Sequence, residues 1–375
     1  MEKLRDKVIL IISPQAWGLS FVSKHHYAQE LARRGNTVFF LNPMSRVRIE
    51  GGARLTRISP RLSVVDYNEV FPGNRRWIGP LAVWSQRADI RRIRRVIGRP
   101  LDLVWSFDPF RLQFLGDWGA PLKIYHPVDF HSFWGERRVA GRADIILSCS
   151  HLILGKFSGW GKPLHFINHG LGRHFLSRGT RAAALPGRFK IKAGYVGNLL
   201  YPHLDWELLF RVVDENPAVG FYFIGPFEPG GNLKGNNNFE AQVQKLRTRK
   251  NTFFLGPKPS HQLPGYLRAM DLFLMSYTGK KNMERLANPH KILEYLSVGK
   301  PVVSHYIQEY ADKRDLIHMA EDNDELPGLF RRVVAGLRAK GQGKIVRRRI
   351  AYAAQHSYLL QIRRIERILF GAKEK

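Results

Sequence analysis

Short apolar runs alternate with helical patterns along most of the chain. The run 8–12 predicts a buried strand, the periodicity of 22–34 predicts a helix that Gly35 ends, and 38–41 predicts the next strand. A strand, a helix and a strand in this order form a β-α-β unit of a parallel sheet. Further strands of the same domain are predicted at 62–65, 103–105, 122–125, 145–147 and 164–167.

A second series of the same kind follows a segment that lacks periodicity. Strands are predicted at 193–197, 221–224, 252–255, 272–275 and 301–303, and helices at 205–214, 240–250, 262–270 and 289–298. We therefore expect an α/β protein with two Rossmann-like, doubly wound parallel-sheet domains. The expected parts are a first domain over 1–175, a linker over 176–190, a second domain over 191–340, and C-terminal helices over 341–375 that are candidates to cross back to the first domain.

Composition narrows the class of protein. A chain of 375 residues suits two domains, and a formal net charge of +29 favours polyanions, which include nucleic acid, an anionic membrane surface and phosphorylated substrates. Cys149 is the only cysteine, so the chain forms no internal disulfide, which fits a reducing compartment. We find neither a signal-peptide pattern nor an apolar run of about 18 residues, and we therefore expect a cytoplasmic protein that does not span the membrane.

One predicted helix carries the most informative residues. Asn288 is a good N-cap and Pro289 a good first helical residue, and Gly299 is suited to end the helix. Lys291 lies in the first turn, where a helix N-terminus favours anions such as a diphosphate. Glu294 lies on the same face, where its carboxylate could accept two hydroxyl hydrogen bonds from a ribose. Spacing alone equally allows a surface helix with a Lys291–Glu294 ion pair.

This helix resembles the donor-binding signature of GT-B glycosyltransferases, especially the large family four. There, Pro-x-Lys-x-x-Glu is followed by small-x-Gly-x-Pro-Val-Val, a pattern that Pro289, Lys291, Glu294 and residues 297–303 match. The resemblance implies the GT-B fold, in which two Rossmann-like domains face a cleft. It also implies that Glu294 holds the ribose of a nucleoside-diphosphate sugar.

Other stretches resemble the same family in part. The family often places another Glu eight residues before the ribose one, where this chain has Leu286, and Glu284 lies two residues further upstream. That departure leaves the donor sugar and the stereochemical outcome open. Gly197 would let the backbone approach the phosphates, and Asn198 stands where many relatives have Arg. The remaining donor-binding candidates are Gly256, at the end of a predicted strand, and Gly18, in the loop after the first strand.

Residues 125–133 follow a predicted strand of the first domain. They are similar to a Tyr/Asp-rich stretch in a bacterial subgroup of these enzymes. Asp129, His126 and His131 are therefore the candidates to orient the acceptor hydroxyl or to take its proton. For each histidine, packing or hydrogen bonding within the loop is the alternative.

No metal and no cofactor are expected. The spacing of Asp322 and Asp324 matches a metal-nucleotide motif, but helix capping explains this stretch better. His165 and His169 have metal-like spacing, but the first lies in a predicted strand and the second in a turn. The first strand is not followed by a Gly-x-Gly-x-x-Gly fingerprint, which disfavours NAD or FAD.

A basic stripe lies in the first domain. Its tryptophans precede a predicted helix over 87–99, and a basic helix beside tryptophans is typical of an element that lies on a membrane surface. The alternative is a core-facing helix with a solvated, charged back. The candidates for membrane or acceptor contact are Trp77, Trp84, Arg91, Arg92, Arg94 and Arg95.

Together these features predict a bacterial glycosyltransferase of cell-envelope polysaccharide biosynthesis. It is expected to move a sugar from a nucleoside-diphosphate sugar to a hydroxyl acceptor that is lipid-linked or part of an envelope glycan. The family leads us to expect retention of configuration and no metal. We expect peripheral binding to the anionic inner face of the cell membrane, and no nucleic-acid partner. Two alternatives stay open: a polyanion- or membrane-binding protein on an inactive GT-B scaffold, and a GT-B-fold nucleotide-sugar epimerase.

Overall fold

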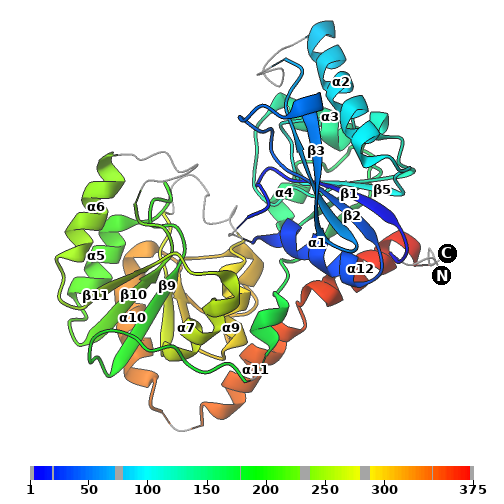
Figure 1. The fold of residues 1–375 in the computed structure, drawn as a ribbon. Helices are drawn as coiled ribbons and strands as arrows, with labels where there is room; N and C mark the ends of the chain where they lie inside the picture. Colours follow the sequence, from blue (N-terminus) through cyan, green and yellow to red (C-terminus); the bar gives the residue numbers. More distant parts are fainter. Residues whose placement is uncertain are drawn as a thin grey trace. The chain divides into compact units, whose positions relative to one another are not determined.

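The structure is a computed structural model that describes residues 4–18, 21–71, 79–177, 179–228, 237–278, 288–339 and 341–371. Contacts divide the chain into two compact units (Figure 1). The first unit comprises Met1–Gly170 and Tyr358–Lys375, and the second comprises Leu171–Ser357. The division thus lies before the expected boundary at 175, and the expected linker 176–190 is assigned to the second unit.

The sheet of the first unit has eight strands in the order β3-β4-β2-β1-β5-β6-β7-β8. All neighbouring strands pair in parallel except β3 and β4, which are antiparallel. The strands are β1 (Val8–Ile12), β2 (Thr37–Leu41), β3 (Ala53–Ser59), β4 (Leu62–Tyr67), β5 (Leu103–Ser106), β6 (Leu122–Tyr125), β7 (Ile145–Ser148) and β8 (Leu164–Phe166). The helices are α1 (Ser23–Arg33), α2 (Pro80–Ile97), α3 (Trp134–Arg142), α4 (His151–Gly155) and α12 (Tyr358–Phe370).

Strand β1 shows why this sheet is buried on both faces. Ile9 and Ile11 belong to one cluster of buried side chains, and Leu10 and Ile12 belong to another. Because side chains alternate between the two faces of a strand, an unbroken apolar run is what a strand covered on both sides requires. The expected doubly wound sheet is therefore confirmed in this unit.

Strand β3 was not predicted. It lies at the edge of the sheet, and all of its side chains are exposed or half-buried. Arg54 and Arg57 lie on it, and charged side chains at a sheet edge discourage pairing with another chain. A strand with so little burial carries no strong apolar pattern, so its sequence resembles that of a loop.

Helix α12 returns the chain to the first unit. The side-chain amide of Gln361 donates hydrogen bonds to the carbonyl oxygens of Asn168 (2.9 Å) and His169 (2.8 Å). Glu366 accepts from the Arg34 guanidinium at 2.6 Å. The expected C-terminal segment 341–375 is thereby divided, since α11 (Gly343–Ala354) belongs to the second unit.

The second unit contains a fully parallel sheet of six strands in the order β11-β10-β9-β12-β13-β14. These strands are β9 (Ile191–Val196), β10 (Val219–Ile224), β11 (Thr252–Gly256), β12 (Leu272–Met275), β13 (Val302–Ser304) and β14 (His318–Met319). The helices that precede α11 are α5 (Trp206–Asp214), α6 (Asn237–Arg247), α7 (Leu263–Ala269), α9 (Lys291–Ser297) and α10 (Leu326–Gly336). Except for the two-residue β14, each strand was predicted from its apolar run.

Short one-turn 3₁₀ helices complete the described segments. They are η1 (Glu50–Gly52), η3 (Leu115–Trp118), η4 (Arg173–Leu176), η5 (Ser260–Gln262), η7 (Gln308–Tyr310) and η8 (Asn323–Glu325). Among the described residues, no helix combines the length and the apolar character that crossing a membrane requires.

Candidate functional site

The carboxyl edge of the second sheet gathers the residues of the predicted donor site. Strand β9 ends next to Gly197, β11 ends at Gly256, and β12 is followed by Tyr277. Helix α9 packs against this part of the sheet through Tyr295, whose ring stacks on Phe273 with centroids 4.1 Å apart. Ligands of open α/β sheets bind at this edge because the loops that follow parallel strands converge there.

Helix α9 begins later than the sequence suggested. Its N-cap is His290 and its first helical residue is Lys291, so Asn288 and Pro289 precede the helix and are not its N-cap and first turn. The first amides of the helix donate to carbonyl oxygens three residues earlier, as in a 3₁₀ turn: Ile292 N donates to Pro289 O and Leu293 N to His290 O, both at 3.2 Å. Such a 3₁₀-like start shifts the helix boundary by two residues.

Lys291 presents its ammonium to the end of β9. A Cβ placed on Gly197 would lie 2.6 Å from Lys291 Nζ, so only glycine leaves room for the lysine in this position. Lys291 Nζ also donates a hydrogen bond to the Tyr277 hydroxyl at 3.4 Å and lies 5.9 Å from the centroid of the Tyr195 ring. The structure therefore holds a half-buried cation directly against the glycine turn.

Glu294 lies one turn further along α9, with 16% of its side chain exposed. Burial raises the pKa of its carboxyl to about 7, although the positive charge of Lys291 opposes the shift. The basic side chain within ion-pair distance of Glu294 is that of His290, with 3.9 Å between Oε1 and Nε2. The surface-helix alternative, with a Lys291–Glu294 ion pair, is thus not what forms.

Tyr295 fixes α9 to the sheet. Its hydroxyl accepts a hydrogen bond from Val196 N at 2.9 Å and donates to Val196 O at 3.3 Å. Val196 is the last residue of β9, so this contact holds Lys291 and Glu294 in register with the glycine turn. Tyr295 was not among the site residues predicted from the sequence.

Three glycine turns meet at the same edge. Gly225, which follows β10, has a φ of 140°, and a Cβ there would lie 2.0 Å from the Gly197 carbonyl oxygen. Gly225 N donates to Gly256 O at 3.0 Å, so Gly256 supports the turn with its backbone. Asn198 Oδ1 accepts from Leu200 N at 2.8 Å, which uses the side-chain carbonyl of Asn198 to hold the loop.

In the first unit, Gly18 lies in the loop after β1. It is exposed, and a Cβ added to it would meet no atom within 4 Å, so no close approach of the described residues requires glycine there. The neighbouring Trp17 fixes the loop, because its amide donates to Asn42 Oδ1 at 2.7 Å and its ring lies 5.0 Å from that of Phe40.

His126 is buried in an aromatic stack. Its ring centroid lies 4.8 Å from that of Phe107, and its Nδ1 accepts a hydrogen bond from Trp105 Nε1 at 3.3 Å. Burial lowers the pKa of His126 to about 3, so the imidazole is neutral near pH 7. Of the two interpretations left open, this geometry favours packing for His126.

Asp129 and His131 lie in the loop that follows β6. Asp129 is exposed, whereas His131 is half-buried against the ring of Phe110, with centroids 4.9 Å apart. Lys24, on α1, was not identified from the sequence, yet it is only 2% exposed. Burial lowers the pKa of Lys24 to about 8, and the charge of Asp129 opposes that shift, which places the two groups in electrostatic contact.

With this geometry in place, comparison with known proteins finds a family to which part of the chain is similar. Residues 190–312 match the model of the family described as glycosyl transferases group 1. The matched stretch is less than half of the chain and is similar to a group 1 glycosyltransferase domain. The match begins just before β9 and ends after β13, so the matched range contains Gly197, Lys291 and Glu294.

One curated protein is similar in sequence to part of the chain. A Bacillus subtilis (strain 168) protein, provisionally named teichuronic acid biosynthesis glycosyltransferase TuaH, is 27% identical over 176 residues. That alignment covers 45% of this chain and 42% of the relative, so the chain matches less than half the length of this curated protein.

Solved structures extend the likeness to the whole fold. Sucrose-phosphate synthase from Thermosynechococcus elongatus has a TM-score of 0.69 at 14% identity and covers 98% of this chain and 100% of its own. Anabaena HepE, solved with UDP and glucose, has a TM-score of 0.67 at 14% identity, with 97% and 99% covered. A Rickettsia africae ESF-5 glycosyltransferase reaches 0.69 at 12% identity, with 99% and 100% covered. At such identities the likeness concerns the fold, which is GT-B.

The basic stripe of this GT-B chain lies on α2. Trp84 is 51% exposed, while Ile90, Ile93 and Ile97 are buried. The helix is therefore core-facing on one side, and its opposite side carries exposed arginines. Within the stripe, Arg91, Arg94 and Arg95 are exposed and Arg92 is half-buried. Trp77 lies outside the described residues, and so do Leu286 and Glu284 of the predicted donor site.

Helix capping accounts for the Asp-x-Asp stretch, which lies beyond the matched residues. Asp322 is the N-cap of η8, and its side chain accepts a hydrogen bond from Asp324 N at 3.0 Å, so the expected capping role is confirmed. Among the described residues, no cluster of three or more His, Cys, Asp or Glu side chains is arranged to hold a metal ion.

Proposed function

We propose that this protein transfers a sugar from a nucleoside-diphosphate sugar to a hydroxyl acceptor. The observation that carries the proposal is the position of Lys291, whose ammonium lies against Gly197 at the carboxyl edge of a domain similar to group 1 glycosyltransferases. A cation held there by packing is suited to the charge that develops on a departing diphosphate.

Lys291 would bind the diphosphate as a point charge. Its described polar partner is the neutral Tyr277 hydroxyl at 3.4 Å, a long hydrogen bond that a phosphate oxygen can replace. In this proposal the lysine supplies the positive charge that stabilises the leaving group, without a metal. Charge-assisted hydrogen bonds of this kind contribute about 1.5–3 kcal/mol each.

Glu294 would bind the ribose. A carboxylate with a pKa of about 7 is close to half protonated at neutral pH, and hydroxyl donors stabilise its ionised form. Ribose binding should therefore lower the pKa of Glu294 and release a fraction of a proton. The solved HepE complex contains UDP and glucose, which makes a uridine nucleotide the first donor to test.

The acceptor is proposed to be lipid-linked or an envelope glycan. The name of the Bacillus relative refers to teichuronic acid, a cell-wall context that supports this choice. Asp129, exposed and in electrostatic contact with Lys24, is the stronger of the remaining candidates to accept the hydroxyl proton, with His131 beside it in the loop. We further propose retention of configuration and peripheral association with the inner face of the membrane.

A thermal-shift panel tests the donor site. UDP, GDP, ADP and their sugars are added to the wild type, to Glu294→Ala and to Glu207→Ala, which removes an exposed carboxylate of the same unit. A ligand at about 100 times its Kd stabilises a protein by about 2.7 kcal/mol, which raises the melting temperature visibly. We expect one nucleotide to stabilise the wild type and Glu207→Ala but not Glu294→Ala. A folded wild type that no nucleotide stabilises would refute the donor proposal.

A further inference from the structure

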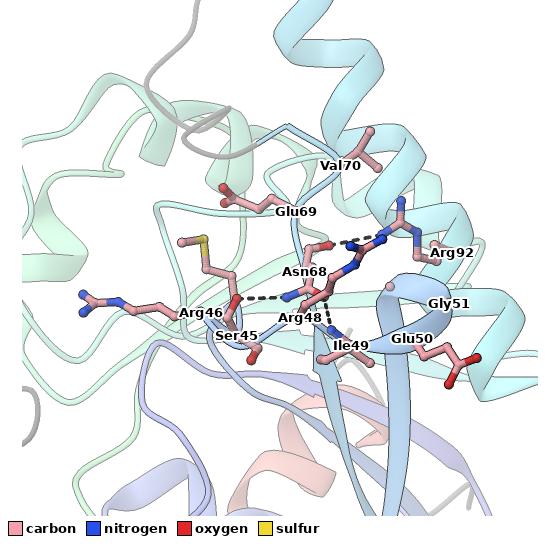
Figure 2. Close-up of a pocket in the computed structure, with 12 residues that line it drawn as sticks. Ser45, Arg46, Arg48, Ile49, Glu50, Gly51, Asn68, Glu69, Val70 and Arg92 are labelled. Atoms are coloured by element: carbon pink, nitrogen blue, oxygen red, sulfur yellow. Dashed lines mark hydrogen bonds between the residues drawn. The ribbon is translucent and has the colours of Figure 1, made fainter.

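A basic cavity of about 1070 Å³ lies in the first unit and includes Arg92 of the basic stripe (Figure 2). Arg48 comes from the segment after β2, Glu69 from the segment after β4, and Arg92 from α2. The cavity thus opens at the carboxyl ends of two neighbouring parallel strands, where α/β sheets hold their ligands. A volume of this size accommodates a sugar or lipid headgroup.

Asn68 organises the wall of the cavity. Its side-chain amide donates to the carbonyl oxygens of Ser45 (3.0 Å) and Val47 (2.9 Å), and its Oδ1 accepts from Ile49 N at 2.7 Å. Its own amide donates to Gly52 O at 2.9 Å. Four hydrogen bonds therefore shape the loop that presents Arg48, so the wall is formed before any ligand arrives.

The position of the Arg92 side chain depends on two glycines. Gly51 and Gly52 have φ values of 66° and 73°, and a Cβ on Gly52 would lie 2.0 Å from an Arg92 terminal nitrogen. The guanidinium therefore lies directly on the Gly52 backbone, where any side chain would displace it. Its described hydrogen bond is a long one, to Asn68 O at 3.4 Å, which leaves most of its donors available to a ligand.

The other two arginines of the cavity are not neutralised. Within the described residues, neither Arg46 nor Arg48 makes a hydrogen bond or an ion pair. Figure 2 shows Arg48 and Arg92 close to Asn68, whereas Arg46 extends away from them. A planar guanidinium group can donate two parallel hydrogen bonds to the oxygens of one phosphate, so Arg48 and Arg92 favour a phosphate ligand.

Two carboxylates also line the cavity, from Glu50 and Glu69. They would repel a ligand that is anionic throughout, and they can accept hydrogen bonds from hydroxyl groups. The chemistry that suits the whole lining is therefore a phosphate ester that also carries hydroxyl groups.

Exposed apolar side chains lie on the segments that supply the cavity lining and on α2. Val47, between Arg46 and Arg48, is 76% exposed, and Phe71, next to the lining residue Val70, is 40% exposed. The Phe71 ring lies 5.9 Å from that of Trp84, on the same helix as Arg92. Leu81 and Trp84 are 58% and 51% exposed. A basic cavity whose lining segments also carry exposed aliphatic and aromatic side chains is suited to an amphipathic ligand.

We propose that this cavity binds the phosphate and hydroxyl groups of a lipid-linked molecule, whose apolar part lies on Val47, Phe71, Leu81 and Trp84. Arg48 and Arg92 would bind the phosphate. The inference rests on the proposed function only in taking this molecule to be the sugar acceptor. Binding itself needs neither a donor nor turnover, so the two proposals can fail separately.

The test uses a short-chain phosphatidic acid that stays monomeric in solution, and glycerol 3-phosphate as the same headgroup without an apolar part. Titration calorimetry on the full chain compares the wild type with Arg48→Gln/Arg92→Gln and with Arg48→Gln alone, which removes a side chain without described partners. The matched control is Arg99→Gln/Arg137→Gln, which removes the same charge from exposed positions of the first unit that do not line the cavity.

We expect the lipid to bind the wild type at least about tenfold more tightly than glycerol 3-phosphate, because its chains bury apolar surface. The cavity double variant should lose at least about tenfold in affinity for both ligands, since charge-assisted hydrogen bonds are removed. Arg48→Gln should lose part of this, and the control should stay within about twofold at physiological salt. UDP stabilisation should be the same in all of them.

Three results would overturn the inference. Equal losses of affinity in the cavity double variant and in the control would mean that the ligand binds through the net positive charge of the surface and not through this cavity. Equal affinity for the lipid and for glycerol 3-phosphate would remove the apolar contact. Tighter binding of a single-stranded oligonucleotide than of the lipid, lost in the same variant, would assign the cavity to nucleic acid.

Discussion

Replacing Gly197 by alanine should weaken nucleotide binding while leaving the fold intact. The new Cβ would lie 2.6 Å from Lys291 Nζ and 3.1 Å from Lys291 Cε, so the end of the lysine must move away to reach an ordinary contact of about 3.5 Å. Lysine is flexible, and the φ of Gly197 is not positive, so the change should cost less than about 1 kcal/mol of folding stability.

The displacement sets the size of the effect on binding. With an effective dielectric constant of about 20, moving the ammonium from about 2.8 to about 3.7 Å from a phosphate oxygen costs about 1.4 kcal/mol. This corresponds to an increase of about tenfold in Kd. The expected loss is therefore measurable, and it arises from a residue that has no side chain of its own.

Titration calorimetry with UDP measures the change, and Gly336→Ala is the control. Gly336 lies at the end of α10 in the same unit, and a Cβ there meets no atom within 4 Å. We expect Gly336→Ala to bind like the wild type. If Gly197→Ala is folded and binds UDP with unchanged affinity, the ammonium beside Gly197 does not bind the nucleotide and the reasoning is wrong.

Ionisable groups of both units supply three more tests. Burial raises the pKa of the Glu294 carboxyl from 4.5 to about 7, so the folded protein loses stability as the pH rises through that interval and the carboxyl ionises. In urea unfolding, Glu294→Gln should therefore be more stable than the wild type by about 2–3 kcal/mol near pH 8 and similar to it near pH 4. A stability difference that does not change with pH would contradict this. UDP binding should release protons near pH 7, seen as a calorimetric enthalpy that depends on the ionisation enthalpy of the buffer; equal enthalpies in two buffers would exclude a Glu294–ribose contact. Asp129→Asn should lower the initial rate of sugar transfer about 10²–10⁴-fold with little loss of folding stability. His126→Ala should instead cost about 2–4 kcal/mol of stability in urea unfolding. If His126→Ala lost only activity and Asp129→Asn lost only stability, the two roles would have to be exchanged.

Much of the fold could be predicted because buried parallel strands are apolar throughout. Strands such as β1 and β10 are covered on both faces, so their runs are legible without knowledge of their neighbours. Edge strand β3 could not be predicted in this way, because its partly exposed side chains depend on pairing with β4. The start of α9 was misplaced because Asn288 and Pro289 suit a helix start, while the chain forms a tighter turn at His290.

The residues of the candidate site likewise fall into those that local sequence could predict and those that it could not. Lys291 and Glu294 could be found because their spacing within one helix is local. Tyr277 could not, because it reaches Lys291 only through the folded sheet. Lys24 is equally hidden, since a lysine in the first turn of a helix gives no sign that it will be 2% exposed. The cavity around Arg48 and Arg92 joins segments far apart in sequence, which no motif records.

The central claim is that Lys291 binds the diphosphate of a sugar nucleotide. The most direct measurement is the Kd of UDP for the wild type, Lys291→Ala and Lys300→Ala, where Lys300 lies just beyond the opposite end of the same helix. The account predicts that Lys291→Ala binds UDP at least about tenfold more weakly, as expected for the loss of a charge-assisted hydrogen bond, while Lys300→Ala binds it like the wild type. Equal affinities in all three folded proteins would contradict it.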